Sequence, residues 1–274
     1  MPFSFCSPWL ARRLDLSAEK MCMAPDGEAP RRSPARHSPH NPTRPRKSRR
    51  KTAKPSGPDL SKYDFAFPSS TVAAERILQP SPGRPAITGK KYAVFSSPMA
   101  IATYQPIVNL LSASGLAKQV NGVWYFDVRK YVDLVKAGWR WTNIRGNATY
   151  PVNKRILITT ADPRTSNSAA MFLSIVSYVA NHNTVVQSEA DEKKVLPLVA
   201  RLFVNQGYTD NSSEGPFDDY LALGMGKSPM VNIYEAQFVD AAAQKKLKPG
   251  MVLMYPPTYG TLERLLDGVS KSYR

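Results

Sequence analysis

A basic, proline-rich segment near the N-terminus sets the strongest limit on how this chain can fold. Between Arg31 and Lys54 the sequence carries ten basic residues and no acidic residue, with prolines at positions 34, 39, 42 and 45. Like-charge repulsion, low hydrophobicity and repeated proline leave too little apolar surface to offset the entropy lost on ordering. We therefore expect residues 1–58 to form a disordered tail and the folded part of the chain to follow it.

The composition of the whole chain excludes several classes of protein. Hydrophobic residues make up 42% of the 274 residues, which is enough to build a core. No apolar run approaches the ~20 residues that a membrane-spanning helix needs. Cys6 and Cys22 both lie in the tail, and His182 is the only histidine outside it. We therefore expect no disulfide framework, no metal site and no cofactor.

The tail has some features of a nucleic-acid-binding arm and of a secretory signal, but it is expected to be neither. The run 46–51 has the composition of a nuclear-import or nucleic-acid-binding arm, but no aromatic residue interleaves it for base stacking, so specific nucleic-acid recognition is not expected. The apolar stretch 3–10 is broken by Ser7 and Pro8 and precedes the basic pair Arg12 and Arg13. A secretory signal has the opposite order, so the chain as written is expected to be cytoplasmic.

From Tyr63 onward, short apolar runs alternate with helical stretches, which indicates a layered α/β fold. The expected strands are short, apolar and bounded by Pro, Ser, Gly or Asp, and they cover residues 63–67, 92–95, 155–160, 230–234 and 251–255. The expected helices have apolar residues at three- and four-residue spacing, and they cover residues 71–78, 104–111, 128–137, 166–179, 189–205 and 217–223.

Three of the expected strands end in a small polar cluster, two of them directly before an expected helix. These clusters supply the candidate ligand-binding residues Ser69, Ser70, Ser96, Ser97, Asp162, Arg164, Ser166, Asn167 and Ser168. Each serine or aspartate taken singly is explained by N-capping of a helix. Helix starts at the carboxyl ends of strands also present backbone N–H groups that suit an anionic or hydroxylated ligand. Three clusters in one chain therefore predict a shared binding cleft, with Arg164 and Asn167 as further contacts.

Catalysis and nucleotide hydrolysis find no support in the sequence. The run Gly224-Met225-Gly226-Lys227-Ser228 resembles a phosphate-binding loop, but Leu221 stands where the first glycine is required. His182 is predicted to lie in a polar surface loop, without a nucleophile to activate. The acidic pairs 191–192 and 218–219 are adjacent along helices and are interpreted as solvated helix starts. We expect no catalytic residue and no metal ligand.

Taken in order, five motifs between about Tyr63 and Tyr255 resemble those of bacterial type II extracellular solute-binding proteins. The motifs are YDFAFPSS, VFSSPMAIATYQP, ILITTADPRTSNSAAMFLSIVSYVAN, SSEGPFDDYLALGMGKSPMVNIYEAQF and MVLMYPPT. The resemblance is strongest to the branch that shares a fold with molybdate- and sulfate-binding proteins, some of which carry a von Willebrand factor A domain.

The resemblance implies a two-lobed protein that closes on a small solute without making or breaking a bond. Ser69, Ser70, Ser96 and Ser97 would come from the first lobe and hinge, and Asp162, Arg164, Ser166, Asn167 and Ser168 from the second. Tyr234 and Glu235 would come from the return crossing, on the resemblance alone, and a structural role at the hinge is an equal alternative. The ligand would be an oxyanion, a carboxylate or a sugar, and the partner a membrane permease or a sensor domain.

The same resemblance predicts the domain organisation. Residues 59–102 and 231–274 would form a partial first lobe with the hinge strands, and residues 103–230 the second lobe. The first strands of the family and its C-terminal helices are missing or reduced, the latter to 261–272. The family is exported, so a displaced start or reading frame is one explanation, and a variant with a reduced first lobe is another. Alternative functions are a nucleic-acid-associated protein acting through its tail, a non-functional fragment of a solute-binding protein, and an enzyme on a related fold.

Overall fold

The computed structural model describes residues 64–66, 71–80, 87–92, 96–206 and 210–257. The described residues fall into two compact units, one that ends at Lys91 and one that begins at Tyr92. The predicted tail at 1–58 and the predicted C-terminal helix at 261–272 lie outside the described residues.

The described part of the first unit contains one helix, α2 (Thr71–Leu78), with the bounds that its spacing predicted. Ile77 is buried, the Leu78 carbonyl accepts a hydrogen bond of 3.1 Å from the Ile87 N–H, and Lys91 pairs with Glu75. The strand predicted at 63–67 is not found in its described part, because Asp64–Ala66 has no strand conformation.

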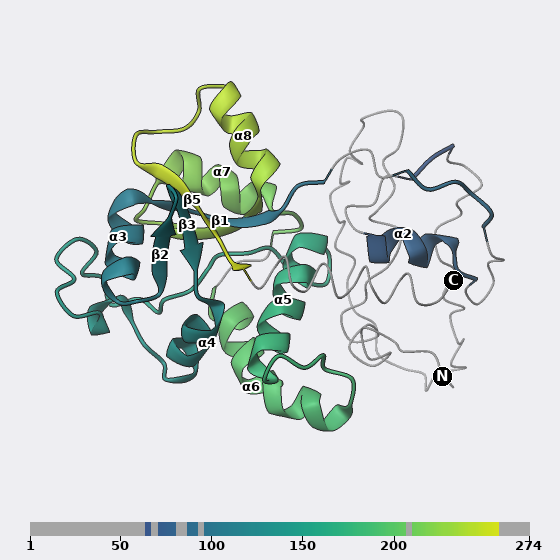
Figure 1. The fold of residues 1–274 in the computed structure, drawn as a ribbon, viewed down its shortest axis with the longest axis horizontal. Coiled ribbons are helices and arrows are strands. Elements are labelled where there is room, and N and C mark those ends of the chain that lie inside the picture. The colour runs from purple at the N-terminus through teal and green to yellow at the C-terminus, as the bar shows by residue number, and fades with distance from the viewer. Residues whose placement is uncertain (1–63, 67–70, 81–86, 93–95, 207–209, 258–274) are drawn as a thin grey trace, which may run out of the picture. The chain divides into compact units, whose positions relative to one another are not determined.

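The second unit is built on a mixed sheet of five strands (Figure 1). These are β1 (Met99–Tyr104), β2 (Ala117–Val120), β3 (Val123–Phe126), β4 (Met230–Tyr234) and β5 (Met251–Tyr255), in the order β2-β3-β5-β1-β4. Strand β1 runs antiparallel to both β4 and β5, while β3 runs parallel to β5. The mixed α/β class is confirmed, and β4 and β5 have their predicted bounds.

Helices cover both faces of this sheet, so the unit has three layers (Figure 1). The helices are α3 (Gln105–Ala113), α4 (Val128–Lys136), α5 (Asn167–Ala180), α6 (Glu189–Val204), α7 (Glu214–Leu223) and α8 (Glu235–Ala243). Met99, Ile101 and Met230 pack in one core with α3 to α6. Ala102 and Val231, from the opposite face of the sheet, pack with α7 and α8 in a second core.

Local capping explains where several helices begin. Asp127 accepts the Lys130 N–H at 3.0 Å before α4, and Ser188 accepts the Asp191 N–H at 3.1 Å before α6.

The interpretation of the acidic pair 191–192 as a solvated helix start was wrong for Glu192. This residue is only 7% exposed and continues the buried stripe of α6 formed by Val195, Leu198 and Leu202.

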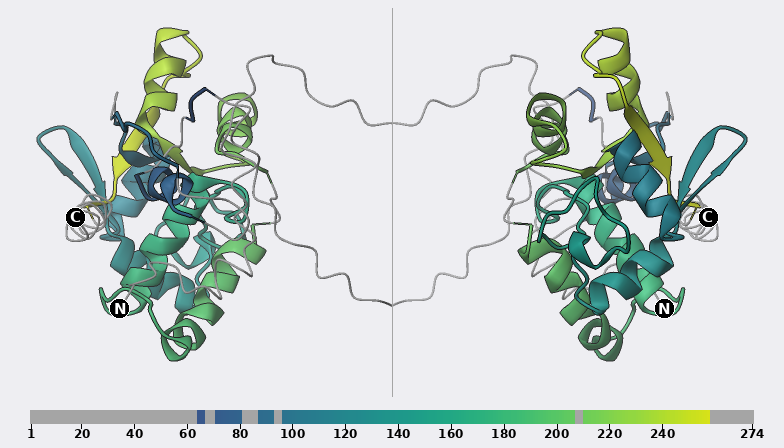
Figure 2. Two further views of the ribbon diagram at one scale, coloured as in Figure 1. Left: turned by 90° about the vertical axis from the view of Figure 1, so that its right-hand side faces the viewer. Right: turned by 90° about the vertical axis from the view of Figure 1, so that its left-hand side faces the viewer.

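The predicted set of strands and helices contained none of β1, β2, β3 and α8. Strands β2 and β3 form a hairpin that projects from one end of the sheet (Figure 2), and its turn is Asn121-Gly122, with φ of 50° and 82°. Both values are positive, as a two-residue hairpin turn of type I′ requires. Strand β1 was expected only from the family resemblance, and helix α8 was missed.

The strand predicted at 155–160 was wrong in extent. Within it only Arg155 and Thr159 form bridges, and they pair with two different neighbours, Arg140 and Val231.

Of the strand predicted at 92–95, Tyr92 is not in a strand and the rest lies outside the described residues. The lobe boundaries at 102–103 and 230–231 stay a prediction. Strands from both sides of them share the one sheet.

A buried hydroxyl between α4 and the 155–160 segment provides a test of this packing. Tyr131 is fully buried, its hydroxyl oxygen accepts the Ile158 N–H at 3.1 Å, and burial raises the pKa of Tyr131. Tyr131→Phe leaves that N–H buried without an acceptor, so we expect a loss of about 1–3 kcal/mol in the free energy of unfolding. Urea denaturation measures it, with Tyr125→Phe on β3 as control. Equal losses in both variants would contradict the packing described.

Candidate functional site

The candidate site lies where two parallel segments end at one edge of the sheet. Thr159 pairs in parallel with Val231 of β4, through hydrogen bonds of 2.9 Å from the Thr159 N–H to Met230 and from the Asn232 N–H to Thr159. The first segment leads through a short loop into α5, and β4 leads directly into α8. Figure 1 shows the two helices leaving this edge in opposite directions. We call this region, formed by residues 97–98, 160–168, 232–236 and 255, the polar edge.

Asp162 organises the loop before α5. Its carboxylate accepts the Arg164 N–H at 2.9 Å, and its carbonyl accepts the N–H groups of Thr165 and Ser166 at 3.1 and 2.9 Å. Ser166 caps α5, since its side-chain oxygen accepts the Ala169 N–H at 3.4 Å. The turn and cap roles that explained these residues singly are therefore both present.

Arg164 is bound by its own chain. Its Nε lies 2.9 and 3.0 Å from the two Asp162 carboxylate oxygens, and its Nη2 lies 2.5 Å from Oδ2. These hydrogen bonds, and then the carboxylate charge, raise the pKa of the Arg164 guanidinium. Two of its three nitrogens are engaged in this way, so a ligand would meet the remaining N–H groups or compete with Asp162.

A buried polar group lies behind this loop. Thr160, Ser166, Ser168 and Asn232 are each less than 10% exposed. The Ser166 and Ser168 hydroxyls are 2.8 Å apart, and the Asn232 Nδ2 lies 3.5 Å from both the Thr160 hydroxyl and the Ser168 carbonyl. Asn167, the first residue of α5, is half-buried beside them. The structure thus brings the predicted residues of the 162–168 cluster together around the start of one helix.

Three distant segments meet at the start of α8. The Ser97 hydroxyl accepts the Ala236 N–H at 2.9 Å, the Pro98 carbonyl accepts the Glu235 N–H at 2.9 Å, and the Tyr255 hydroxyl donates to the Glu235 carboxylate. Burial, then the bond to Glu235 and its charge, raise the pKa of Tyr255. Ser97 therefore caps α8 from another part of the chain.

The two groups are neighbours along β4. Asn232 and Tyr234 are alternate residues, so both side chains lie on the face of β4 that packs against α5, about 6–7 Å apart along the strand. Tyr234 is partly buried in the core that contains α5. Ser97, Tyr234 and Glu235 are thereby brought to the same edge as the 162–168 cluster.

The remaining predicted site residues are not joined to this group. Ser96 is exposed, although it is adjacent to Ser97, and Ser69 and Ser70 lie outside the described residues. Sequence reasoning missed Thr160, Asn232 and Tyr255. A polar residue in the middle of the apolar strand MVNIY was a signal for Asn232, whereas nothing in the local sequence pointed to Tyr255.

The polar edge can bind through hydrogen bonds, but its described residues offer no reactive centre. No group of three His, Cys, Asp or Glu side chains that could hold a metal ion occurs in the described part of the chain. His182 is exposed in the loop after α5, as predicted, at a φ of 54°. The charged side chains at the edge are Asp162, Arg164 and Glu235, and each is bonded to another residue of the chain.

Comparisons of the chain with family models, with curated proteins and with solved structures gave no match. Of the helices that the structure describes, none is long and apolar enough to cross a membrane. The inference about function therefore depends on the geometry of the polar edge.

The cap of α8 gives a matched pair of variants. Ser97→Ala removes the acceptor of the Ala236 N–H, so we expect the free energy of unfolding to fall by about 0.5–2 kcal/mol. Ser96→Ala, one residue away and exposed, is the control. Urea denaturation compares the two, and an equal effect of both substitutions would show that Ser97 does not cap α8.

Tyr255 gives a test in pH. Its pKa is raised in the folded state, so the unfolded chain ionises first as the pH rises through about 10. The stability contributed by Tyr255 is therefore present at neutral pH and is lost progressively in alkali. We expect Tyr255→Phe to be less stable than the wild type at pH 7, and the difference to shrink toward pH 11, as measured by urea denaturation. A difference independent of pH would contradict the bond to Glu235.

Proposed function

We propose that this chain is a non-catalytic binding protein for a small solute, of the two-lobed type II solute-binding kind, acting in transport or sensing. In this proposal the polar edge is the second-lobe and hinge half of an interlobe cleft. A permease or a sensor domain is the partner.

The observation that carries the proposal is the meeting of two helix starts at one edge of the sheet. The first turns of α5 and α8 each present backbone N–H groups that have no partner within the helix. Those of Ala169, Glu235 and Ala236 are already bonded to Ser166, Pro98 and Ser97, so a ligand would meet the other N–H groups of these turns or displace these partners. The helix dipoles add a partial positive charge at the same edge. In open α/β sheets, ligands bind at this position, outside the carboxyl ends of the strands.

The chemistry of the side chains supports a bound ligand that is not transformed. Ser166, Ser168, Thr160 and Asn232 lie buried behind the loop and support it with hydroxyl and amide groups, which donate and accept hydrogen bonds without adding charge. The fixed charges of the edge are two carboxylates and one guanidinium, and Arg164 is neutralised by Asp162. Binding of an oxyanion, a carboxylate or a sugar would thus depend on backbone N–H groups and neutral side chains more than on ion pairing.

The proposal is tested by thermal denaturation of the full chain against a panel of oxyanions, carboxylates and sugars. One compound is expected to raise the melting temperature in a saturable way, without being consumed. A ligand at 100 times its Kd stabilises the folded state by about 2.7 kcal/mol. A panel in which no compound stabilises the protein, or one in which the stabilising compound is turned over, would contradict the proposal.

A pair of serines on α5 locates the bound compound. Ser168 is buried at the polar edge, whereas Ser174 lies on the exposed side of the same helix and donates to the Ala170 carbonyl at 2.9 Å. We expect Ser168→Ala to weaken binding by about tenfold or more and Ser174→Ala to leave it unchanged, in titration calorimetry with the compound found in the panel. Equal affinities of both variants would place the ligand elsewhere.

A further inference from the structure

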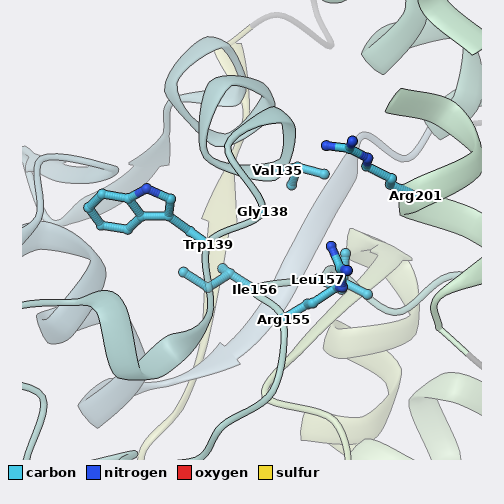
Figure 3. A pocket seen from close by; sticks show the side chains of 7 residues that line it. All are labelled: Val135, Gly138, Trp139, Arg155, Ile156, Leu157 and Arg201. Carbon is cyan, nitrogen blue, oxygen red and sulfur yellow. The ribbon is translucent and has the colours of Figure 1, made fainter. Parts of the chain in front are cut away.

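A shallow hollow lies in a different part of the second unit, between the end of α4, the 155–157 segment and the end of α6 (Figure 3). We call it the arginine hollow; it is lined by Val135, Gly138, Trp139, Arg155, Ile156, Leu157 and Arg201. Val135 and Ile156 are buried and form an apolar floor. Figure 3 shows both arginine side chains on one side of the hollow, with the indole of Trp139 pointing away from them. None of the lining residues belongs to the polar edge.

Hydrogen bonds hold the Arg201 side chain and the backbone at Arg155 in place. The Nη1 of Arg201 donates to the Lys136 carbonyl at 2.7 Å, which anchors its guanidinium at the end of α4. Arg155 forms an antiparallel bridge with Arg140, flanked by hydrogen bonds from Ile156 to Trp139 at 3.4 Å and from Trp141 to Lys154 at 2.9 Å. The Arg201 guanidinium and the backbone at Arg155 would therefore need little reordering to meet a ligand, whereas the Arg155 side chain would be ordered by the ligand.

The bridge between Arg140 and Arg155 brings two like charges together. The flanking hydrogen bonds make it a non-hydrogen-bonded pair, in which the two side chains lie on the same side and close to each other. Like charges directly opposite one another destabilise a strand pair. Arg201 adds a third positive charge from α6.

The described residues supply no carboxylate to balance these charges. The lining of the arginine hollow contains no acidic residue. The side-chain hydrogen bonds described for Arg140, Lys154 and Arg201 all go to backbone carbonyls, those of Asn153, Gly226 and Lys136. Elsewhere in the described chain, cations do pair with carboxylates: Lys91, Lys130, Arg164, Lys193 and Lys194. The arginine hollow thus has a surplus of positive charge over an apolar floor, with both arginine side chains exposed to solvent.

We propose that the arginine hollow binds a phosphate group. A phosphate carries up to two negative charges near neutral pH and has oxygens in several directions, so it can bridge guanidinium groups that arrive from different elements. A carboxylate carries one charge and two oxygens in a plane, and so balances this cluster less completely. Planar guanidinium forks on fixed backbones are the arrangement by which proteins recognise phosphate groups.

The test is titration calorimetry of the full chain with inorganic phosphate at low ionic strength. We expect saturable binding with one site, and Kd values for Arg155→Gln and Arg201→Gln at least about tenfold weaker than for the wild type. Lys118→Gln, which removes the same charge from an exposed position on β2, is the control and should bind as the wild type does. Arg155→Gln is the decisive variant, because no described hydrogen bond of the fold uses the Arg155 side chain. Circular dichroism checks that Arg201→Gln, which loses its bond to Lys136, still folds.

Two outcomes overturn the proposal: no saturable phosphate binding, or binding that Arg155→Gln leaves unchanged. Phosphate bound only by the basic residues of the tail would give the second outcome, because Arg155→Gln would not change that binding. If the proposal holds, glycerol 3-phosphate and a phosphoserine peptide distinguish the source of the group. Tighter binding of the first assigns the arginine hollow to a small phosphorylated molecule, and tighter binding of the second assigns it to a phosphorylated protein. Both results depend on Arg155.

Discussion

The pairing of β1 on both of its edges is the constraint on which the rest of the second unit depends. Strands β4 and β5 flank β1 and both run antiparallel to it. Their carboxyl ends therefore meet at the edge where β1 begins. The segment before β1 supplies Ser97 and Pro98, the end of β4 supplies Glu235, and the end of β5 supplies Tyr255. The direction of the strands therefore brings the segments of the polar edge together, and single side chains then bond across it.

The polar edge and the arginine hollow differ in their electrostatics. At the polar edge the charged side chains are paired within the chain, so that neutral donors and helix starts are what a ligand would meet. At the arginine hollow the Arg201 guanidinium has only a backbone carbonyl as its described partner, and no described hydrogen bond uses the Arg155 side chain. One region is therefore suited to a solute that is recognised by hydrogen bonds, and the other to a group that brings its own negative charge.

The sequence was informative where structure is local. The apolar runs at β4 and β5 and the helical spacing of α2, α4, α5 and α6 led to bounds that agree within one residue. The β2–β3 hairpin was missed although Asn121-Gly122 is a strong turn signal. The 155–160 run has the residue types of a strand, but its bridges go to two different neighbours, which no local pattern reveals. For the same reason the cap of α8 by Ser97, 139 residues earlier in the chain, and the contact of Tyr255 with Glu235 could not be derived from sequence.

The pairing of β1 also affects how the protein can be made. Its two neighbours are residues 230–234 and 251–255, so about 130 residues emerge from the ribosome between β1 and the strands that cover its edges. During that interval an apolar strand with the sequence MAIATY has both edges open, and open apolar edges pair readily with other chains. Contacts of such long sequence separation also form slowly. Synthesis of this chain would accordingly depend on protection of β1 until its partners arrive, since the strand that is paired on both sides in the finished sheet is open on both sides in the nascent chain.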